Sequence, residues 1–424
     1  MSKPAGFVKD SKWVIFPRMA FANKPQIEKN LKEMSEQFSQ YEKNILTGSG
    51  KMASGRHLGI ATGGVSYTYV KEALHNTELG DTDCKLLKIS TLPFPEKLAL
   101  DFLQGACELE EVLVIEELDP IIENELIRLC GIFNLNIKIL GKQTGHIQIA
   151  GENTVDSVTK AIAAFIGIEL PHPASLTLPV LPVRPPVLCA GCPHRASFFA
   201  VKEATKGISA VYTGDIGCYT LGNAQPLNMV DTCLCMGAGI TVAQGLHRIE
   251  PDTVHFAFIG DSTFFHTGIP GIINAVYNQT DIIVVVLDNS TTAMTGNQPH
   301  PGMGLTMMGT KTEKISIEKI VEAINVSAVV KVNPFDQKAA KEAVRSLIQQ
   351  KGVRVLLFEA PCIIVSKGKG KAAIDASKCI GCQVCIKKIG CPAISMDNGK
   401  AVIDNSLCTG CGICVDLCAK GAIQ

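Results

Sequence analysis

The sequence has no excess of either charge. Its 424 residues include 40 basic and 40 acidic side chains, so the formal net charge is zero. Proteins that bind nucleic acid or a membrane surface electrostatically usually carry a basic patch or a basic excess. The balance therefore gives no support for a nucleic-acid-binding or a membrane-binding protein.

Long hydrophobic runs are also missing. The longest apolar run close to the polar motifs described below is Ile282 to Leu287, which has the length of a strand. A membrane helix needs roughly 18 or more apolar residues. The N-terminal sequence MSKPAGFVKDSKWVIF has an apolar run of only four residues, too short for the core of a signal peptide. We therefore expect a cytoplasmic protein.

Hydrophobic residues and cysteines, by contrast, are plentiful. Hydrophobic residues make up 46% of the chain and charged residues 19%, which is enough for large buried cores. Eight of the 17 cysteines lie between Cys379 and Cys418. Cytosolic thiols stay reduced, so clustered cysteines are better explained as metal ligands than as disulfides. We expect the isolated Cys84, Cys107 and Cys130 to be core residues.

The order of strand-like and helix-like segments predicts an α/β fold in several parts. Apolar residues recur every three or four positions from Ile27 to Ile45, the period of an amphipathic helix packed on its own domain or on a partner. Beyond them, strands alternate with helices, which favours parallel sheets. The predicted parts are a helical arm (1–55), a parallel α/β domain (56–170), a proline-rich linker (171–186), a second parallel α/β domain (187–366) and a small α+β cysteine-rich module (375–424).

The cysteine-rich module has two C-x2-C-x2-C runs, each followed by a fourth cysteine. This is the pattern of two-cluster ferredoxins, in which the fourth cysteine ligates the cluster of the other run. That rule predicts one [4Fe–4S] cluster on a first tail set (Cys379, Cys382, Cys385 and Cys418) and another on a second tail set (Cys391, Cys408, Cys411 and Cys414). Five residues separate Cys385 from Cys391 where three are usual, and Ala419 replaces a frequent proline. Zinc sites or free thiols are the alternatives.

A second motif lies in the second α/β domain. Gly260-Asp261-Ser262 follows one apolar strand and Asn289 follows the next, with a helix between them. Such loops meet at the carboxyl edge of a parallel sheet, where Asp261, Asn289 and the Thr291 carbonyl can hold Mg²⁺. The motif resembles the thiamine diphosphate motif, GDG followed by NN, although here it reads GDS and DNS. An ordinary α/β unit is the alternative.

Two further features support that interpretation. Met236, in the sequence CMGAG, is a candidate for the apolar wedge between the two rings of thiamine, although it could equally be a core residue. Four cysteines at predicted loop ends of the same domain could converge on a third [4Fe–4S] cluster, with buried free thiols as the alternative and Cys233 as a competing ligand. This domain set comprises Cys189, Cys192, Cys218 and Cys362.

Residues 56–424 resemble the large (alpha) subunits of indolepyruvate:ferredoxin oxidoreductases. The resemblance rests on GDIGCYTLG, CMGAGI, GDSTFFHTGIPGIINAVYNQ, LDNSTTAMTGNQPHPG and the two-cluster tail. It implies oxidative decarboxylation of an arylpyruvate such as indolepyruvate with coenzyme A, giving arylacetyl-CoA and CO2. Electrons would pass through the clusters to ferredoxin, and a small (beta) subunit would be the partner. Another 2-oxoacid, or a non-catalytic electron-transfer subunit, remains an alternative.

The resemblance also implies roles for individual residues. Asp261, Asn289 and the Thr291 carbonyl would bind Mg²⁺. Gly260, Ser262, Thr263 and Thr295 would lie by the diphosphate, and Met236 and Gly237 by the pyrimidine. The candidates for carboxylate binding or proton handling, which could instead be ordinary loop residues, are His194, Arg195, His266 and His300.

One domain of the family has no counterpart in this sequence. The family's subunit begins with a pyrimidine-binding domain that carries a catalytic glutamate, whereas MSKPAGFVKDSKWV looks like the stretch just after it. We expect that domain on a separate chain, unless this chain is a fragment. Residues 56–170 resemble the transketolase C-terminal-like domain. Their GIATGGVSYTYV segment has no GxGxxG motif, so we assign them a structural role.

Overall fold

The computed structural model forms two compact units, Met1–Pro179 and Val180–Gln424. The structure describes residues 6–75, 79, 83–105, 108–170, 179–366, 368 and 370–424. The boundary falls within the predicted linker 171–186, of which residues 171–178 lie outside the described part, as does Cys107. No helix among the described residues is both long enough and apolar enough to cross a membrane.

The first unit is built around a five-stranded sheet in the order β1-β3-β2-β4-β5. In that order the strands span Ile45–Thr47, Lys85–Ile89, Leu58–Gly63, Glu111–Ile115 and Lys138–Leu140. All pairs are parallel except the edge strand β1, which runs antiparallel to β3.

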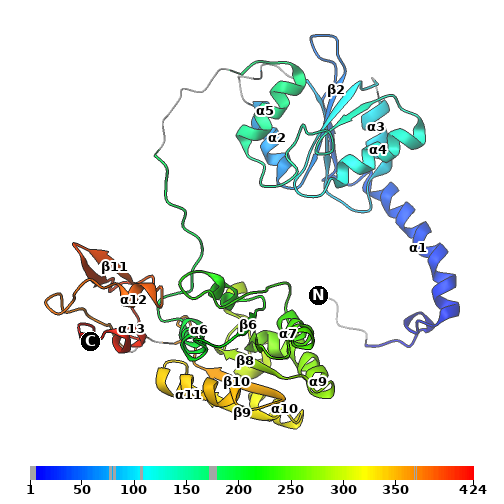
Figure 1. Cartoon of the computed structure of the whole chain (residues 1–424). Helices are drawn as coiled ribbons and strands as arrows, with labels where there is room; N and C mark the ends of the chain where they lie inside the picture. The colour runs from blue at the N-terminus through cyan, green and yellow to red at the C-terminus, as the bar shows by residue number, and fades with distance from the viewer. Residues whose placement is uncertain are drawn as a thin grey trace. The chain divides into compact units, whose positions relative to one another are not determined.

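Helices cover both faces of this first sheet (Figure 1). Apolar side chains of α2 (Ser66–His75) and α5 (Val155–Ile166) fill one core, and those of α3 (Glu96–Gln104) and α4 (Ile121–Phe133) fill the other. Buried Cys84 and Cys130 belong to these cores. The strands are near-continuous apolar runs because both faces are buried.

The N-terminal segment differs from the prediction of a helical arm. Helix α1 (Pro17–Phe38) ends seven residues before Ile45, which lies instead in β1 of the first sheet. Most of the apolar stripe is solvent-exposed, including Ile27 at 50% and Leu31 at 41% exposure. The last turn is anchored to the first unit, because buried Ser35 donates a hydrogen bond to the Phe94 carbonyl (2.5 Å). Residues 1–55 therefore combine an exposed helix with a sheet edge.

The second unit contains a fully parallel five-stranded sheet in the order β6-β7-β8-β10-β9. In that order the strands span Ala210–Thr213, Val254–Gly260, Ile282–Asp288, Val353–Glu359 and Ala328–Val332. Helices α6 (Pro193–Ala204) and α11 (Gln337–Ile348) pack on one face, and the other is covered by α7 (Ala238–Ile249), α9 (Ile269–Tyr277) and α10 (Ile317–Ala323). This is the second parallel-sheet domain that the sequence predicts.

The cysteine-rich module packs on the α6 face of that sheet. It contains the antiparallel pair β11 (Ile394–Asp397) and β12 (Lys400–Ile403) and the short helices α12 (Val384–Lys387) and α13 (Ile413–Leu417). Apolar residues of the module share one core with α6 and α11, and Ile389 and Ile413 lie in the same cluster as Phe198 and Phe199. The predicted fold class, two parallel-sheet domains and a small α+β module, is confirmed.

Candidate active site and electron-transfer centres

The carboxyl ends of β7 and β8 bring the predicted magnesium ligands together. Asp261 begins the short helix α8 (Asp261–Thr263) and is 2% exposed. Its Oδ1 accepts the Ser262 N–H (2.7 Å), and its Oδ2 accepts the N–H groups of Ser290 (2.8 Å) and Asn289 (3.1 Å). The carboxylate is thus fixed between the two loops, as expected where neighbouring parallel strands end.

The side chain of Asn289 completes a group of oxygen donors. Its amide faces Asp261 Oδ2 at 3.3 Å and the Thr291 carbonyl oxygen at 2.7 Å. With the amide nitrogen turned inward, Asn289 donates to both. With Oδ1 turned inward, three oxygens converge, and that is a donor set that Mg²⁺ accepts. The residues present therefore fit a magnesium ion.

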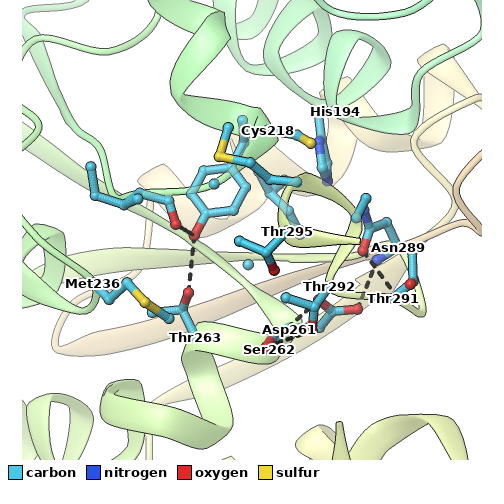
Figure 2. Close-up of a pocket in the computed structure, with 17 residues that line it drawn as sticks. His194, Cys218, Met236, Asp261, Ser262, Thr263, Asn289, Thr291, Thr292 and Thr295 are labelled. Atoms are coloured by element: carbon cyan, nitrogen blue, oxygen red, sulfur yellow. Dashed lines mark hydrogen bonds between the residues drawn. The ribbon is translucent and has the colours of Figure 1, made fainter. Parts of the chain in front are cut away.

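A pocket of about 150 Å³ opens beside these residues. In Figure 2, Asp261, Ser262 and Thr292 lie at one side of it, with His194 and Cys218 at the opposite side. The predicted site residues that line it are His194, Cys218, Met236, Gly260, Asp261, Ser262, Thr263, Asn289, Thr291 and Thr295. Small hydroxyl side chains form much of the wall, and the hydroxyl of Thr292 donates to that of Ser262 (2.9 Å).

Two important residues of this site were missed by the sequence reasoning. Asp215 is fully buried, and its Oδ1 accepts the N–H groups of Ile216 (2.8 Å) and Gly237 (2.7 Å). Burial raises the pKa of this carboxyl. The Gly237 backbone is thereby fixed by Asp215, and Gly237 is not among the residues that line the pocket. The available signal was Gly214-Asp215 after a strand, the same pair as Gly260-Asp261.

Tyr219 is the second missed residue. Its hydroxyl donates to the Ile216 carbonyl (3.0 Å) and lies 3.3 Å from Thr263 Oγ1. Its ring packs against the backbone of Gly260, where an added Cβ would lie only 2.5 Å from the ring. Glycine is therefore needed at position 260 for the close approach of the ring.

His194 is a buried side chain with no hydrogen-bond partner among the described residues. It is 3% exposed, and both ring nitrogens are unpartnered. Burial lowers the pKa of His194 to about 4, against the raising effect of Asp261. The ring lies edge-on to Tyr219 with centroids 5.6 Å apart. A neutral imidazole with free nitrogens at a pocket wall is suited to a ligand, since unpaired buried polar groups are costly.

The other three catalytic candidates lie outside the pocket lining. His300 is buried with Nε2 3.1 Å from Asp261 Oδ2, and its Nδ1 accepts the Gly302 N–H (3.2 Å). His266 is exposed on the π-helical turn Phe264–Gly268, so the structure does not bring it to the site. Arg195 is buried against the cysteine-rich module. Backbone carbonyls occupy the Nη1 and Nη2 groups of its guanidinium, and Arg195 does not line the pocket.

Two cysteines of the domain set lie at the pocket, because Cys218 lines it and the Cys362 N–H donates to the carbonyl of Asn289 (2.9 Å), another lining residue. Cys192 caps the N-terminus of α6, Cys189 lies in the loop before it, and Cys362 follows β10. Burial raises the pKa of Cys218, and the neighbouring thiols of Cys362 and Cys189 raise it further. Cys189 likewise contributes to the raised pKa of Cys192. Cys218 also lines the pocket, so this set borders the proposed cofactor site.

Each tail set surrounds a cavity of its own. One cavity is lined by Cys391, Cys408, Cys411 and Cys414, and the other by Cys379, Cys382, Cys385 and Cys418. This is the exchange of the fourth cysteine that two-cluster ferredoxins show. No group of three or more His, Cys, Asp or Glu side chains in the described part of the chain is close enough to hold a single ion. A four-iron cluster separates its thiolates more widely than one ion does.

Comparison with known families assigns two of the domains. Residues 215–358 match the family described as thiamine pyrophosphate enzyme, C-terminal TPP binding domain. Residues 371–419 match the 4Fe-4S dicluster domain. The chain thus belongs to the class in which a thiamine-diphosphate-binding domain is joined to an iron–sulfur dicluster domain.

Curated relatives define the family within that class. The chain is 38% identical to "Indolepyruvate oxidoreductase subunit IorA" of Methanothermobacter thermautotrophicus, covering 99% of this chain and 67% of that protein. Identity to the same subunit of Thermococcus kodakarensis is 37%, covering 91% of this chain and 62% of that protein. A more distant relative, "2-oxoglutarate synthase subunit KorB" of Archaeoglobus fulgidus, is 27% identical over 42% of this chain and 70% of its own length.

The chain belongs to the family of the indolepyruvate oxidoreductase subunit IorA, which confirms the resemblance drawn from its motifs. It spans 62% to 67% of the length of the two family members compared here.

Proposed function

We propose that this chain is the diphosphate-binding and electron-exit part of a cytoplasmic 2-oxoacid:ferredoxin oxidoreductase. Its substrates would be an arylpyruvate such as indolepyruvate and coenzyme A, and its products arylacetyl-CoA, CO2 and reduced ferredoxin. The observation that carries the proposal is Cys218, which belongs to the domain set and also lines the pocket beside Asp261. The electron-accepting group would therefore adjoin the cofactor.

The residues of the pocket divide into three tasks. Asp261, Asn289 and the Thr291 carbonyl would hold Mg²⁺ through oxygen atoms. The hydroxyl groups and backbone at Gly260, Ser262, Thr263, Thr292 and Thr295 would bind the diphosphate. Met236 of the pocket wall would lie by the pyrimidine, together with the adjacent Gly237, which Asp215 fixes. Thiamine diphosphate, when bound, supplies the electron sink for decarboxylation. The chain orients it, keeps water out and offers the neutral His194 as a hydrogen-bonding group.

Apolar side chains at the pocket support the arylpyruvate assignment. Ile216 and Met236 are each 39% exposed and Met294 is 50% exposed, and all three line the pocket. Methionine is unbranched and adapts its shape to planar rings, and its sulfur makes favourable contacts with aromatic groups. The name of the relatives points to the same substrate class.

The proposal requires partners. A small (beta) subunit and ferredoxin would act with this chain, and a pyrimidine-binding domain would supply the catalytic glutamate. We propose two [4Fe–4S] clusters on the tail sets and a third on the domain set. Iron analysis of anaerobically prepared protein tests the count, since three clusters require about twelve irons per chain and two require about eight.

Reconstitution tests the reaction. The chain would be mixed anaerobically with the small subunit, a pyrimidine-binding domain, thiamine diphosphate, Mg²⁺ and coenzyme A. Reduction of a viologen dye would then be followed with indolepyruvate, phenylpyruvate, pyruvate or 2-oxoglutarate. We expect arylpyruvates to be preferred and acyl-CoA to form. A preference for pyruvate by orders of magnitude would overturn the substrate assignment, and no reduction with any 2-oxoacid would overturn the reaction.

A matched pair of variants localises the activity in that assay. Asn289→Ala removes an expected magnesium ligand at the pocket. Asn278→Ala removes an exposed amide at the end of α9 that bonds only the Asn274 carbonyl among its described contacts. We expect Asn289→Ala to lose most activity and Asn278→Ala to keep it.

A further inference from the structure

Arg195 joins the thiamine-binding domain to the cysteine-rich module. It lies in the first turn of α6, three residues after Cys192, and is 4% exposed. Its Nη1 donates to the carbonyls of Ile389 (2.6 Å) and Gly390 (2.8 Å), and Nη2 donates to the Leu188 carbonyl. One guanidinium therefore binds backbone on both sides of the contact.

The two partners in the module belong to its unusual loop. Ile389 and Gly390 directly precede Cys391, in the stretch of five residues where two-cluster ferredoxins have three. The same loop makes a second contact, because Lys388 Nζ lies 3.3 Å from Glu203 Oε2 on α6. The extended loop is thus one of the elements that dock the module onto α6.

This docking brings the domain set and the second tail set together. Gly191, between Cys189 and Cys192, packs so tightly on Thr409 that no Cβ fits there. Gly191 and Arg195 line the cavity that the second tail set surrounds. The cavity of the first tail set is lined by residues between 374 and 423, and its Cys382 is exposed. The second tail set is therefore the inner one and the first is the outer one.

Arg195 places a positive charge between the domain set and the second tail set of cysteines. Burial lowers the pKa of Arg195, while the thiolates of Cys391, Cys192, Cys189 and Cys411 raise it, so ligands of both sets lie within range of its charge. Its Nε–H has no hydrogen-bond partner among the described residues. A buried cation beside a cluster stabilises the added electron, and donors to cluster sulfur tune the potential.

We propose that Arg195 positions an electron-transfer junction between the domain set and the second tail set, and that electrons leave through the first tail set. The proposal rests on the proposed function, because it assumes clusters on these cysteines. One electron crossing the junction oxidises the cluster on the domain set by one electron and reduces the cluster on the second tail set by one. No bond or proton need change.

The test uses the full chain with its clusters loaded and titanium(III) citrate as reductant. Electron paramagnetic resonance gives the midpoint potential of each cluster and the spin coupling between neighbouring clusters. The variants are Arg195→Gln and Arg195→Lys. The first removes the positive charge, and the second keeps the charge but removes the planar guanidinium that binds several carbonyls at once. Lys202→Met is the control, because Lys202 is another cation of α6 that binds two backbone carbonyls, those of Pro226 and Leu227, but contacts no module residue among its described partners.

We expect Arg195→Gln to shift one cluster to a more negative potential and to weaken the coupling. Arg195→Lys should weaken the coupling with a smaller shift in potential, and Lys202→Met should match the unmodified protein. Unchanged potentials and coupling in an iron-replete Arg195→Gln variant would overturn the proposal. If Arg195→Gln loses iron from the tail sets, Arg195→Lys provides the test. Spin coupling in Arg195→Lys equal to that of the unmodified protein would then overturn the proposal.

The order of the clusters has its own check. The shifted signal should be the one altered by Cys411→Ser, whereas a shifted signal altered by Cys382→Ser would overturn the order. None of these measurements uses a 2-oxoacid, so failure of the chain to oxidise arylpyruvates would leave them interpretable. Conversely, a negative result at Arg195 would leave the proposed reaction standing.

Discussion

The two parallel sheets place buried acids at similar positions but satisfy them differently. In the first unit, Glu116 follows β4 and accepts the N–H groups of Ile122 (2.9 Å) and Glu123 (3.0 Å), while Glu123 accepts the Lys142 N–H (2.9 Å). In the second unit, the Asn289 amide faces two oxygens and His194 has no partner among the described residues. The same topology thus gives carboxylates that accept backbone N–H groups in the first unit, and polar side chains available to a ligand in the second.

This difference suits the carboxyl edge of the first sheet to a structural role and that of the second sheet to ligand binding. Buried polar groups in folded proteins are nearly always hydrogen-bonded, and the exceptions call for a ligand or a functional reason. In the first unit the hydroxyls of Thr62 and Thr159 also lack a partner among the described residues, but His194 of the second unit lacks one at a pocket wall. We therefore favour the second sheet as the binding edge, although both sheets end in acids and glycines. The following predictions test whether the distinction holds.

The largest expected effect is on cofactor binding. We expect Asp261→Ala to weaken thiamine diphosphate binding in the presence of Mg²⁺ on the order of 100-fold, or about 2.8 kcal/mol, because a charged ligand and the acceptor of three backbone N–H groups are lost. Calorimetric titration measures the affinity. Glu123→Gln is the matched change in the first unit and should leave the affinity unaltered. Equal losses in the two variants would contradict the distinction.

The next prediction compares cysteines of the two units as ligands of an iron–sulfur cluster. We expect Cys362→Ala to lower the iron content by about four atoms per chain, the content of one [4Fe–4S] cluster. Cys84→Ala and Cys130→Ala change cysteines of the first unit, in its apolar cores, and should leave iron unchanged. Iron and sulfide analysis of anaerobic protein measures the content. An unchanged value in Cys362→Ala would remove the domain set from the list of cluster ligands.

Local sequence signals predicted some of these features and could not predict others. Strands β7 and β8 were predictable because they are long apolar runs, whereas β9 (Ala328–Val332) was missed because it is short and includes Lys331. Cysteine spacing grouped the tail sets because the ligands recur at fixed intervals. The role of Arg195 was not predictable, because its partners Ile389 and Gly390 are almost 200 residues away and offer only backbone carbonyls.

His266 and Asp215 both show that distance along the sequence from a motif does not predict distance from the site. His266 follows the GDS motif closely in sequence, but the π-helical turn leaves it exposed. Asp215 lies outside the thiamine motif, but its carboxylate fixes the backbone of Gly237. Proximity along the chain is therefore a weak guide to a site assembled from several loops.

A substitution at buried Glu123 should lower the stability of the first unit without changing cofactor binding in the second. Glu123 is fully buried and its carboxylate accepts backbone N–H groups of Lys142 and Gln143. We expect Glu123→Ala to destabilise the unit by about 1–3 kcal/mol, because the N–H groups are left unpaired. Hydrogen exchange of the segment that contains α4 and β5 measures the loss. Slow exchange equal to that of the unmodified protein would show that water replaces the carboxylate at no cost.

The smallest effect concerns pH. Burial raises the pKa of Glu116, although the N–H groups of Glu123 and Ile122 lower it in part. The folded state therefore binds the proton more tightly, and this contribution to stability is present below the unfolded pKa and lost as pH rises through the folded pKa. We expect Glu116→Gln to gain stability relative to the unmodified protein as pH rises above about 4.3. Hydrogen exchange at the start of α4, measured at several pH values, detects the trend. A relative gain on acidification instead would mean that the N–H groups dominate and that Glu116 is held as a carboxylate.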